Sequence, residues 1–569
     1  MTTSTSASPP AGLVRPPRPG RTNGQWAVDG RAPLNPNEEH KAAGGGLDVR
    51  ERIETLYAVQ GFDAIPDDDL HGRFRWWGLY TQRRQGIDGG RTATLQTHDL
   101  SDRFFMLRVR LDGGSLSLHQ LRVLARISTE FARDTADISD RQNIQYHWIR
   151  VEDVPEIWRR LEEVGLQTTE ACGDTPRVVL GSPLAGIAAE EILDPTRVIE
   201  EITTRFVGDP ELANLPRKFK TAVTGHPSLD VVHEINDISF VGVRHPSLGP
   251  GYDLWVGGGL STTPRLAERL GAFVTQEQAA DVWHGVISIF RDHGYRRLRN
   301  KARLKFLLAE WGVERFREVL ETEYLGYRLA DGPPPAPASG PGDHIGVHLQ
   351  KDGRSYVGVA PVVGRVSGTV LAGLADLMED AGSNRLRLTP HQKLVVLDVP
   401  TDRVGTLVEG LESLGLSAAP SPFRRHTMAC TGIEFCKLAI VETKATAATT
   451  IAALEQRLAD LDLDTPITLN VNGCPNSCAR IQVADIGLKG QIVTIDGEQQ
   501  PGFQVHLGGG LASEDRDEAG LGRTVRGLKV TASDLPDLVE RLVRRWVAGR
   551  NGRETFSSWV QRVDEDELR

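Results

Sequence analysis

The chain has 569 residues, more than one domain usually holds, so several domains are expected. Its net charge of -10 argues against a general nucleic-acid or anionic-membrane binder, because both need a basic surface. Five cysteines are too few for a disulfide scaffold, and no apolar run is long enough to cross a bilayer, so we expect a cytoplasmic protein.

The first 48 residues are expected to form a disordered tail. They begin with MTTSTSASPPAGLVRPPRPGR, which lacks the apolar core of a signal peptide. The segment is basic and serine-rich like a transit peptide, but its prolines would break an amphipathic helix.

The order strand, helix, strand, helix is predicted twice. In the first copy, apolar alternation or helical spacing places these elements at 104–111, Leu121 to Phe131, 144–151 and 155–164. A proline- and glycine-rich linker is expected at 331–343. Beyond it the same order returns, at 355–364, 367–381, 392–399 and 402–414.

Short matches at one spacing suggest that the chain is internally duplicated. Gln142 and Gln392 are 250 residues apart, as are Gly165 and Gly415. Two further pairs lie at nearly the same spacing, Asp237 with Asp485 and the GGGL strings at Gly257 and Gly508. Two related halves are therefore expected to face each other across a pseudo-twofold axis, with room for a cofactor between them.

Four cysteines late in the chain carry the strongest chemical signal. Cys430 and Cys436 lie in HTMACTGIEFCKLA, and Cys474 and Cys478 in NVNGCPNSCARIQ. Four thiolates can hold a zinc ion or an iron–sulfur cluster, and unliganded core thiols are the third reading. Five residues between the first two cysteines exceed the usual zinc spacing, which favours a cluster. Bends at Gly473 and Pro475 would turn amide N–H groups toward the cluster sulfurs.

The segments TGIEFCKLA and NGCPNSCA resemble the siroheme-dependent assimilatory sulfite and nitrite reductases, and the similarity covers nearly all of the chain after about residue 50. The resemblance implies an internally duplicated α/β (α+β) fold. It would comprise ferredoxin-like half-domains within 49–170 and 344–420, and siroheme- and cluster-binding α/β domains at 171–330 and 421–569. It also implies that the four cysteines hold a [4Fe–4S] cluster and that Cys478 is the axial ligand of the siroheme iron.

The substrates of this family are small anions, so the site must be cationic. Arg108 and Arg110 share one face of the strand at 104–111, although a solvated strand face would look the same. The resemblance implies an anion site built from Arg108, Arg177 in CGDTPR, and Lys218 and Lys220 in LPRKFK.

Polar residues in RQNIQYH and TPHQK, and two asparagines near the last cysteines, resemble family segments near siroheme; loop capping is the alternative. The residues expected to contact the cofactor are Arg141, Gln142, Gln145, His391, Gln392, Lys393, Asn472 and Asn476. The GGGL strings would bring amides close to an anionic group or simply form turns.

Two further features, a basic segment and a lone cysteine, give weaker indications of function. YRRLRNKARLKF at 295–306 is a solvated helix, or binds siroheme carboxylates, or docks an acidic electron carrier. Cys172 is a buried unreactive thiol, or it packs against or is covalently linked to Tyr80.

The function that the resemblance implies is the six-electron reduction of sulfite to sulfide by a monomer that takes electrons from ferredoxin. An external donor is expected because no GxGxxG unit follows a strand and no residues are spare for flavin and nicotinamide domains. The alternatives are a nitrite reductase that forms ammonia, a reductase of both anions, and a non-catalytic zinc or iron–sulfur protein.

Overall fold

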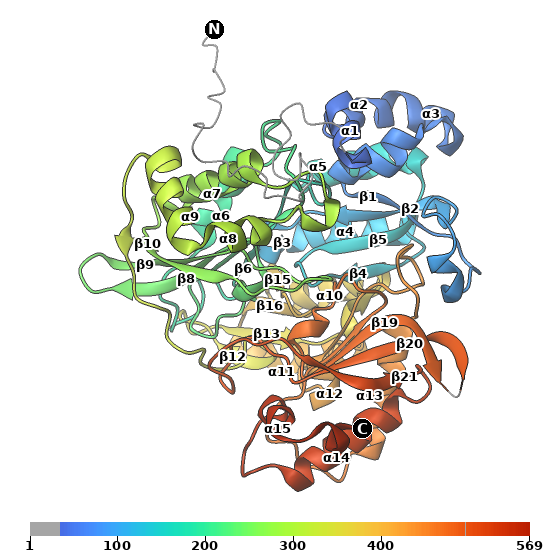
Figure 1. The fold of residues 1–569 in the computed structure, drawn as a ribbon, viewed down its shortest axis with the longest axis vertical. Coiled ribbons are helices and arrows are strands. Elements are labelled where there is room, and N and C mark those ends of the chain that lie inside the picture. The colour runs from blue at the N-terminus through green and yellow to red at the C-terminus, as the bar shows by residue number, and fades with distance from the viewer. Residues whose placement is uncertain (1–34, 496) are drawn as a thin grey trace, which may run out of the picture.

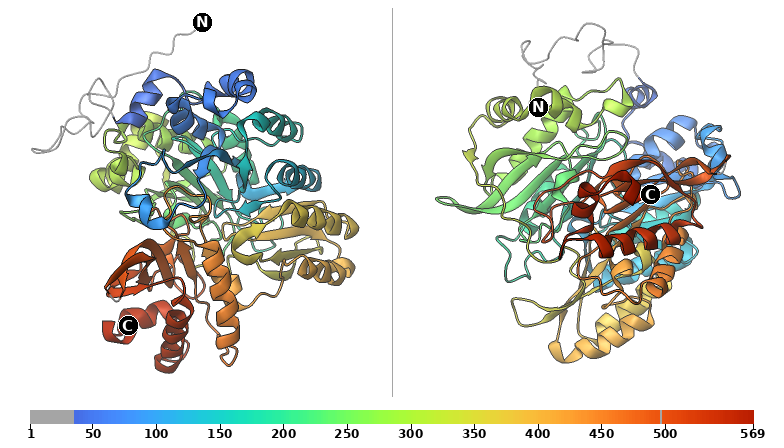
Figure 2. Two further views of the ribbon diagram at one scale, coloured as in Figure 1. Left: turned by 90° about the vertical axis from the view of Figure 1, so that its right-hand side faces the viewer. Right: turned by 60° about the horizontal axis from the view of Figure 1, so that its bottom comes forward.

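The structure is a computed structural model in which residues 35–495 and 497–569 are described. Its strands form four sheets, two in each half of the chain, and helices cover their outer faces (Figure 1). In the left view of Figure 2, the yellow and red elements of the second half lie below the blue and green first half. Within the described ranges, no helix combines the length and apolar character that a membrane span requires.

Two five-stranded sheets are copies of each other. The first has the order β1 (Leu79–Arg83), β2 (Ser101–Val109), β5 (Ile144–Ile149), β4 (Ala136–Ile138) and β14 (Arg365–Val366). The second has the order β12 (Gly346–Leu349), β13 (Ser355–Val359), β16 (Leu394–Val399), β15 (Arg385–Leu388) and β3 (Ser115–Ser117). Their covering helices are α4 (Leu118–Phe131), α5 (Val154–Glu162), α10 (Gly368–Asp380) and α11 (Val404–Ser413). The repeated order predicted from the sequence is confirmed.

These two sheets exchange their last strands. β14 of the second half pairs with β4, and β3 of the first half pairs with β15. Helices α4 and α10 pack closely beside this exchange, where a Cβ at Gly368 would meet the Ala125 carbonyl oxygen at 2.5 Å. One hydrophobic core therefore runs through both half-domains.

The other two sheets also match. One has the order β11 (Ala330–Asp331), β10 (Glu268–Val274), β9 (Gly249–Val256), β8 (Ile238–His245), β7 (Phe219–Thr224) and β6 (Pro176–Gly181). The other has the order β17 (Thr427–Ala429), β18 (Leu469–Asn472), β19 (Ile486–Ile495), β20 (Glu498–Leu507) and β21 (Arg523–Val530). In both, the three strands that come first along the chain are parallel and the later ones antiparallel.

The remaining α-helices either pack beside these sheets or, like α1, α2 and α3, form the beginning of the described chain. They are α1 (Pro36–Ala43), α2 (Val49–Arg52), α3 (Ala58–Gln60), α6 (Thr196–Phe206), α7 (Ala279–His293), α8 (Leu304–Trp311), α9 (Val313–Val319), α12 (Pro422–His426), α13 (Lys444–Arg457), α14 (Leu535–Gly549) and α15 (Phe556–Arg562).

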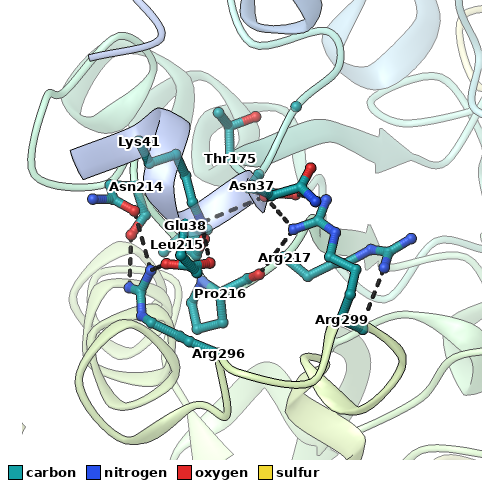
Figure 3. Close-up of polar contacts among 12 residues, drawn as sticks. Asn37, Glu38, Lys41, Thr175, Asn214, Leu215, Pro216, Arg217, Arg296 and Arg299 are labelled. Atoms are coloured by element: carbon teal, nitrogen blue, oxygen red, sulfur yellow. Dashed lines mark hydrogen bonds and ion pairs between the residues drawn. The ribbon is translucent and has the colours of Figure 1, made fainter. Parts of the chain in front are cut away.

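The prediction of a disordered tail over residues 1–48 was wrong for residues 36–43, which form helix α1. Residues 1–34 lie outside the described part, but α1 begins directly after Asn35, whose side chain accepts hydrogen bonds from the first turn. Figure 3 shows α1 against 214–217 and 296–299. Glu38 pairs with Lys41 at 2.6 Å and with Arg296 at 3.2 Å, and all three side chains are buried. The Glu38–Lys41 pair lies within α1, and the Glu38–Arg296 pair ties the helix to a distant part of the chain.

The basic segment 295–306 is not one solvated helix. A short 3₁₀ turn at Arg299–Lys301 precedes α8, which begins at Leu304. The arginines bend the chain toward separate carboxylates, because Arg299 pairs with Asp174 at 2.5 Å and Arg303 with Asp237 at 2.7 Å. The prediction of a solvated helix was therefore wrong.

Candidate active site

A cavity of about 980 Å³ brings the predicted cysteines and most of the predicted cations together. All four late cysteines line it, with Arg108, Arg177 and Lys218 on its wall. Cys430 and Cys474 follow the carboxyl ends of β17 and β18, whereas Arg177 and Lys218 lie at the amino ends of β6 and β7. The cavity is thus built from opposite ends of equivalent strands in the two halves.

The cysteine sulfurs receive backbone hydrogen bonds, as the bends in the sequence predicted. The Gly473 N–H lies 3.2 Å from Cys430 Sγ. Burial raises the pKa of the Cys430 thiol to about 12, with further contributions from Cys478 and Cys436. Thiols buried in this way need bound metal to remain thiolates, so the donor set fits a metal group.

The spacing of the sulfurs distinguishes a cluster from a single ion. Around one zinc ion, ligand atoms are less than about 4 Å apart, because each Zn–S bond is about 2.3 Å. Among the described residues, no three of these cysteines bring their sulfurs within 4.8 Å of one another. The geometry therefore fits a multi-iron cluster better than the zinc alternative.

Arg177 and Arg108 are oriented by neighbouring oxygens. Arg177 donates from Nε to the Gly173 carbonyl at 3.1 Å and from Nη1 to the Ala171 carbonyl at 3.2 Å. Arg108 donates from Nε to Gln145 Oε1 at 3.0 Å across the β2–β5 pair. Arg110 is different, because it is buried and paired with Asp112 at 2.7 Å, which makes it a structural residue.

Lys218 and Lys220 stand close to other cations. Burial, and then Arg141, lowers the pKa of Lys220 to about 7. Burial, and then Lys220, lowers the pKa of Lys218 well below its ordinary value. The Lys220 side chain is half-buried and does not line the cavity wall itself.

Only some of the residues predicted to contact siroheme line the cavity that contains the cysteines. Gln145, Gln392 and Asn476 line the cavity. Arg141 lies behind its wall, where it donates to Asn236 Oδ1 at 2.6 Å and to the Val178 carbonyl at 2.7 Å. His391 and Lys393 line a second, smaller cavity of about 460 Å³ instead.

Three predicted amides bind backbone groups. Gln142 bonds both the N–H and the carbonyl of Gly181, and Gln392 bonds those of Ala429 in the same way. Both glutamines have φ near +60°, so they are equivalent ties between sheets in the two halves. Asn472 bonds the Cys474 carbonyl and the Ala479 N–H, and so shapes the cysteine loop.

Glycines Gly257 and Gly508 form turns, with φ of +81° and +76°. Their amides donate to the carbonyls of Asp237 and Asp485. They therefore contact backbone, and the reading in which these amides approach an anionic group is not supported.

A buried charge cluster beside the cysteines was missed in the sequence. Asp137 pairs with Arg365 at 2.8 Å, with His147 at 3.2 Å and with Lys444 at 3.3 Å. Lys444 begins α13. Burial lowers the pKa of its ammonium group, and Asp137 and, to a smaller extent, Cys430 oppose that shift. The partners come from β4, β5, β14 and α13, so no local pattern could have revealed the cluster.

Other cavity cations were only partly anticipated. Arg299, Arg303 and Lys305 line the wall, and all three fall in the basic segment at 295–306. Arg217 joins them, and its Nη1 donates to the Arg299 carbonyl at 2.9 Å (Figure 3).

Tyr80 lies within electrostatic reach of Cys172 and of the anion residues Arg177 and Arg108. Burial raises the pKa of the Tyr80 phenol, and Cys172 is the second cause of the increase. Tyr80 lines the cavity, whereas the Cys172 side chain is fully buried.

Two family descriptions match the chain. "Nitrite and sulphite reductase 4Fe-4S domain" matches residues 172–329 and 421–569. "Nitrite/Sulfite reductase ferredoxin-like half domain" matches residues 98–164 and 348–414.

Curated relatives and a solved structure align over nearly the whole chain. A sulfite reductase [ferredoxin] of Mycobacterium tuberculosis is 60% identical, covering 97% of this chain and 99% of its own length. A ferredoxin–nitrite reductase of Synechococcus elongatus is 35% identical, covering 90% of this chain and 96% of its own length. The solved structure of Mycobacterium tuberculosis NirA protein superposes with a TM-score of 0.93 and 60% identity, covering 96% of this chain and 100% of that one.

Proposed function

The chain belongs to the nitrite and sulphite reductase family, and from this membership we propose that it reduces sulfite to sulfide with electrons from ferredoxin. The observation that carries the proposal is the single cavity in which four cysteines face Arg108, Arg177 and Lys218. An electron-transfer centre and an anion site thus share one space.

Siroheme and a [4Fe–4S] cluster are the cofactors that this cavity would hold. Cys430, Cys436, Cys474 and Cys478 would ligate the cluster, and Cys478 would also ligate the siroheme iron. Arg217 and Arg299 would meet the carboxylates of siroheme, since charge-assisted hydrogen bonds suit such groups. When bound, the coupled pair supplies low-potential electrons to an open iron position.

The cations of this chain bind and orient the anion. Each unit charge at about 4 Å attracts a charge on sulfite by roughly 4 kcal/mol at an effective dielectric of 20. The two backbone carbonyls that hold Arg177 use two of its five N–H donors, so three remain for the substrate.

Lys218 and Lys220 would supply protons, Lys218 from the cavity wall and Lys220 from the layer behind it. Each oxygen that leaves sulfite departs as water and takes up two protons. A lysine with a pKa near 7 gives up its proton readily at neutral pH, which suits a general acid. Asp237 fixes the Lys220 backbone, because its Oδ2 accepts from the Lys220 N–H at 2.8 Å.

Sulfite is preferred to nitrite in this proposal because the sulfite reductase relatives are 60% identical and the nitrite reductases about 35%. The test compares kcat/KM for sulfite and nitrite in one preparation of holoenzyme with reduced ferredoxin. Sulfide formation at the higher kcat/KM supports the proposal, and ammonia formation at the higher value supports the nitrite alternative. Absence of both products would refute both. Exposed Arg103 supplies a matched control, since Arg103→Ala removes an arginine outside the cavity.

We further propose that Cys172 packs against Tyr80 or is linked to it. A thioether would join Cys172 Sγ to the Tyr80 ring with loss of two hydrogen atoms, and dioxygen would accept the two electrons. Peptide mass spectra distinguish the two forms, because only the linked peptides lose those hydrogens. A monomer located in the cytoplasm completes the proposal, and light scattering of the purified enzyme tests the monomer.

A further inference from the structure

The first half contains a counterpart of the cysteine loop. β7 pairs with β8 through Thr221 and Ile238, and β18 pairs with β19 through Leu469 and Ile486. Each residue of the first pair lies 248 positions before its counterpart in the second. The same spacing aligns TGHPSLD, residues 224–230, with NGCPNSC, residues 472–478.

Metal-binding residue types occupy the cysteine positions of this counterpart. His226 takes the place of Cys474, and Asp230 that of Cys478. The strand pairs β6–β7 and β17–β18 extend the alignment, because Val179 and Thr427 hold equivalent positions. Ser182 thus takes the place of Cys430. Histidine and aspartate are both ligands of divalent zinc-class cations.

A third ligand, His344, comes directly after the linker that joins the halves. His344 Nε2 lies 2.8 Å from Asp230 Oδ2, and ligand atoms of His226, Asp230 and His344 all lie within 4.8 Å of one another. All three side chains are buried, at 6%, 1% and 4% exposure. Among the described residues, no other histidine, cysteine or carboxylate group meets this spacing.

The surroundings are those of a metal site. Ser182 and Thr224 donate hydroxyl hydrogen bonds to the Asp230 carboxylate at 2.7 and 2.8 Å, as second-layer partners of ligating carboxylates do. Glu190 Oε1 lies 3.2 Å from His226 Nε2, and its side chain is 59% exposed. It can therefore act as a fourth ligand and open a path for the ion from solvent.

We propose that His226, Asp230 and His344 bind one divalent cation of the zinc class, with Glu190 as the fourth ligand. The site lies where the second half carries the cysteine loop, so the duplicated fold holds a metal at both equivalent positions. Four ligands suffice for one tetrahedral ion, so the proposed site is mononuclear. The negative charges of Asp230 and Glu190 balance the charge of the ion. Because His226 and Asp230 follow β7 and His344 follows the linker, the bound ion would hold the end of the linker against the first half.

Elemental analysis of the purified holoenzyme tests the proposal. We expect about one zinc per chain in addition to the iron of siroheme and the cluster. X-ray absorption at the zinc edge should show only nitrogen and oxygen neighbours at about 2.0–2.2 Å, whereas zinc misplaced in the cysteine site would show sulfur at about 2.3 Å.

Variants assign the ligands. Asp230→Asn and His344→Gln should each lower zinc at least tenfold with iron unchanged. His293→Gln is the matched control, because His293 is also buried but lies outside the cluster, and it should keep the zinc. Wild-type enzyme without zinc, zinc bound by sulfur, or zinc retained in Asp230→Asn would each overturn the proposal. Since wild-type metal content is itself decisive, a variant that fails to fold does not remove the test.

Discussion

Replacing Asp137 with asparagine tests how the cysteine half is held to the first half. The Asp137 carboxylate is 2% exposed and lies 3.3 Å from Lys444 Nζ. At an effective dielectric of 20, unit charges at this distance attract by about 5 kcal/mol. Desolvation offsets much of that gain, but Asp137→Asn leaves Lys444 buried without its counter-charge. The expected loss of stability is about 3–5 kcal/mol, the usual cost of removing one partner of a buried ion pair.

Urea denaturation of the holoenzyme, followed by tryptophan fluorescence, measures this loss. A protein with several domains need not unfold in two states, so the midpoint of the first transition is compared between variants under one set of conditions. Asp137→Asn combined with Lys444→Met should recover much of the loss, because the unpaired charge is then absent.

Asp376 supplies the matched control. It pairs with Arg122 at 2.8 Å, but its side chain is 64% exposed, so Asp376→Asn should shift the midpoint much less than Asp137→Asn. The reasoning is refuted if Asp137→Asn shifts the midpoint no further than Asp376→Asn, or if the double variant is no more stable than Asp137→Asn alone.

Three further predictions concern the anion site and the electron donor. Arg177→Ala should lower kcat for sulfite by about 10²–10³-fold, as loss of an oxyanion donor does, with the cofactor absorption spectrum unchanged; near-normal turnover would exclude Arg177 from the site. Because the pKa of Lys220 is lowered to about 7, this lysine loses its proton as pH rises above 7, and kcat/KM for nitrite should fall. Nitrite is the substrate for this test because its own charge does not change near pH 7. Between pH 7 and its ordinary pKa of 10.5, this lysine is neutral when folded and charged when unfolded, so its contribution to stability rises with pH; both trends should vanish in Lys220→Met. The rate with reduced ferredoxin should fall as ionic strength rises above about 0.1 M, while the rate with a small neutral reductant should not, and a salt-independent ferredoxin rate would contradict electrostatic docking.

Sequence motifs were sufficient for the parts of the site that are local. The four cysteines lie in two short segments, and Arg177 and Lys218 lie in recognisable loops, so each could be named before its position in space was known. The duplication was also visible, because both copies keep similar lengths between matching strands. Sequence spacing reports such features well, since they depend on neighbours along the chain.

Contacts between distant residues were not predictable in this way. Gln142 was expected to contact siroheme but bonds the Gly181 backbone instead, because an amide that bonds backbone and one that bonds a cofactor look the same in a sequence. β3 and β14 have three and two residues, too few to show an alternation pattern. The Glu38–Arg296 pair joins residues 258 positions apart, and nothing near either residue announces the other.

The exchange of β3 and β14 bears on how the chain is made and how it arose. During synthesis, one edge of β4 has no partner strand until β14, which contains Arg365 and Val366, has left the ribosome. An unpaired strand edge can pair with other chains. An ancestor of half the length would have met the same need by lending its short strand to an identical partner, as domain-swapped dimers do. Fusion of two such copies would turn a contact between molecules into one within a single chain.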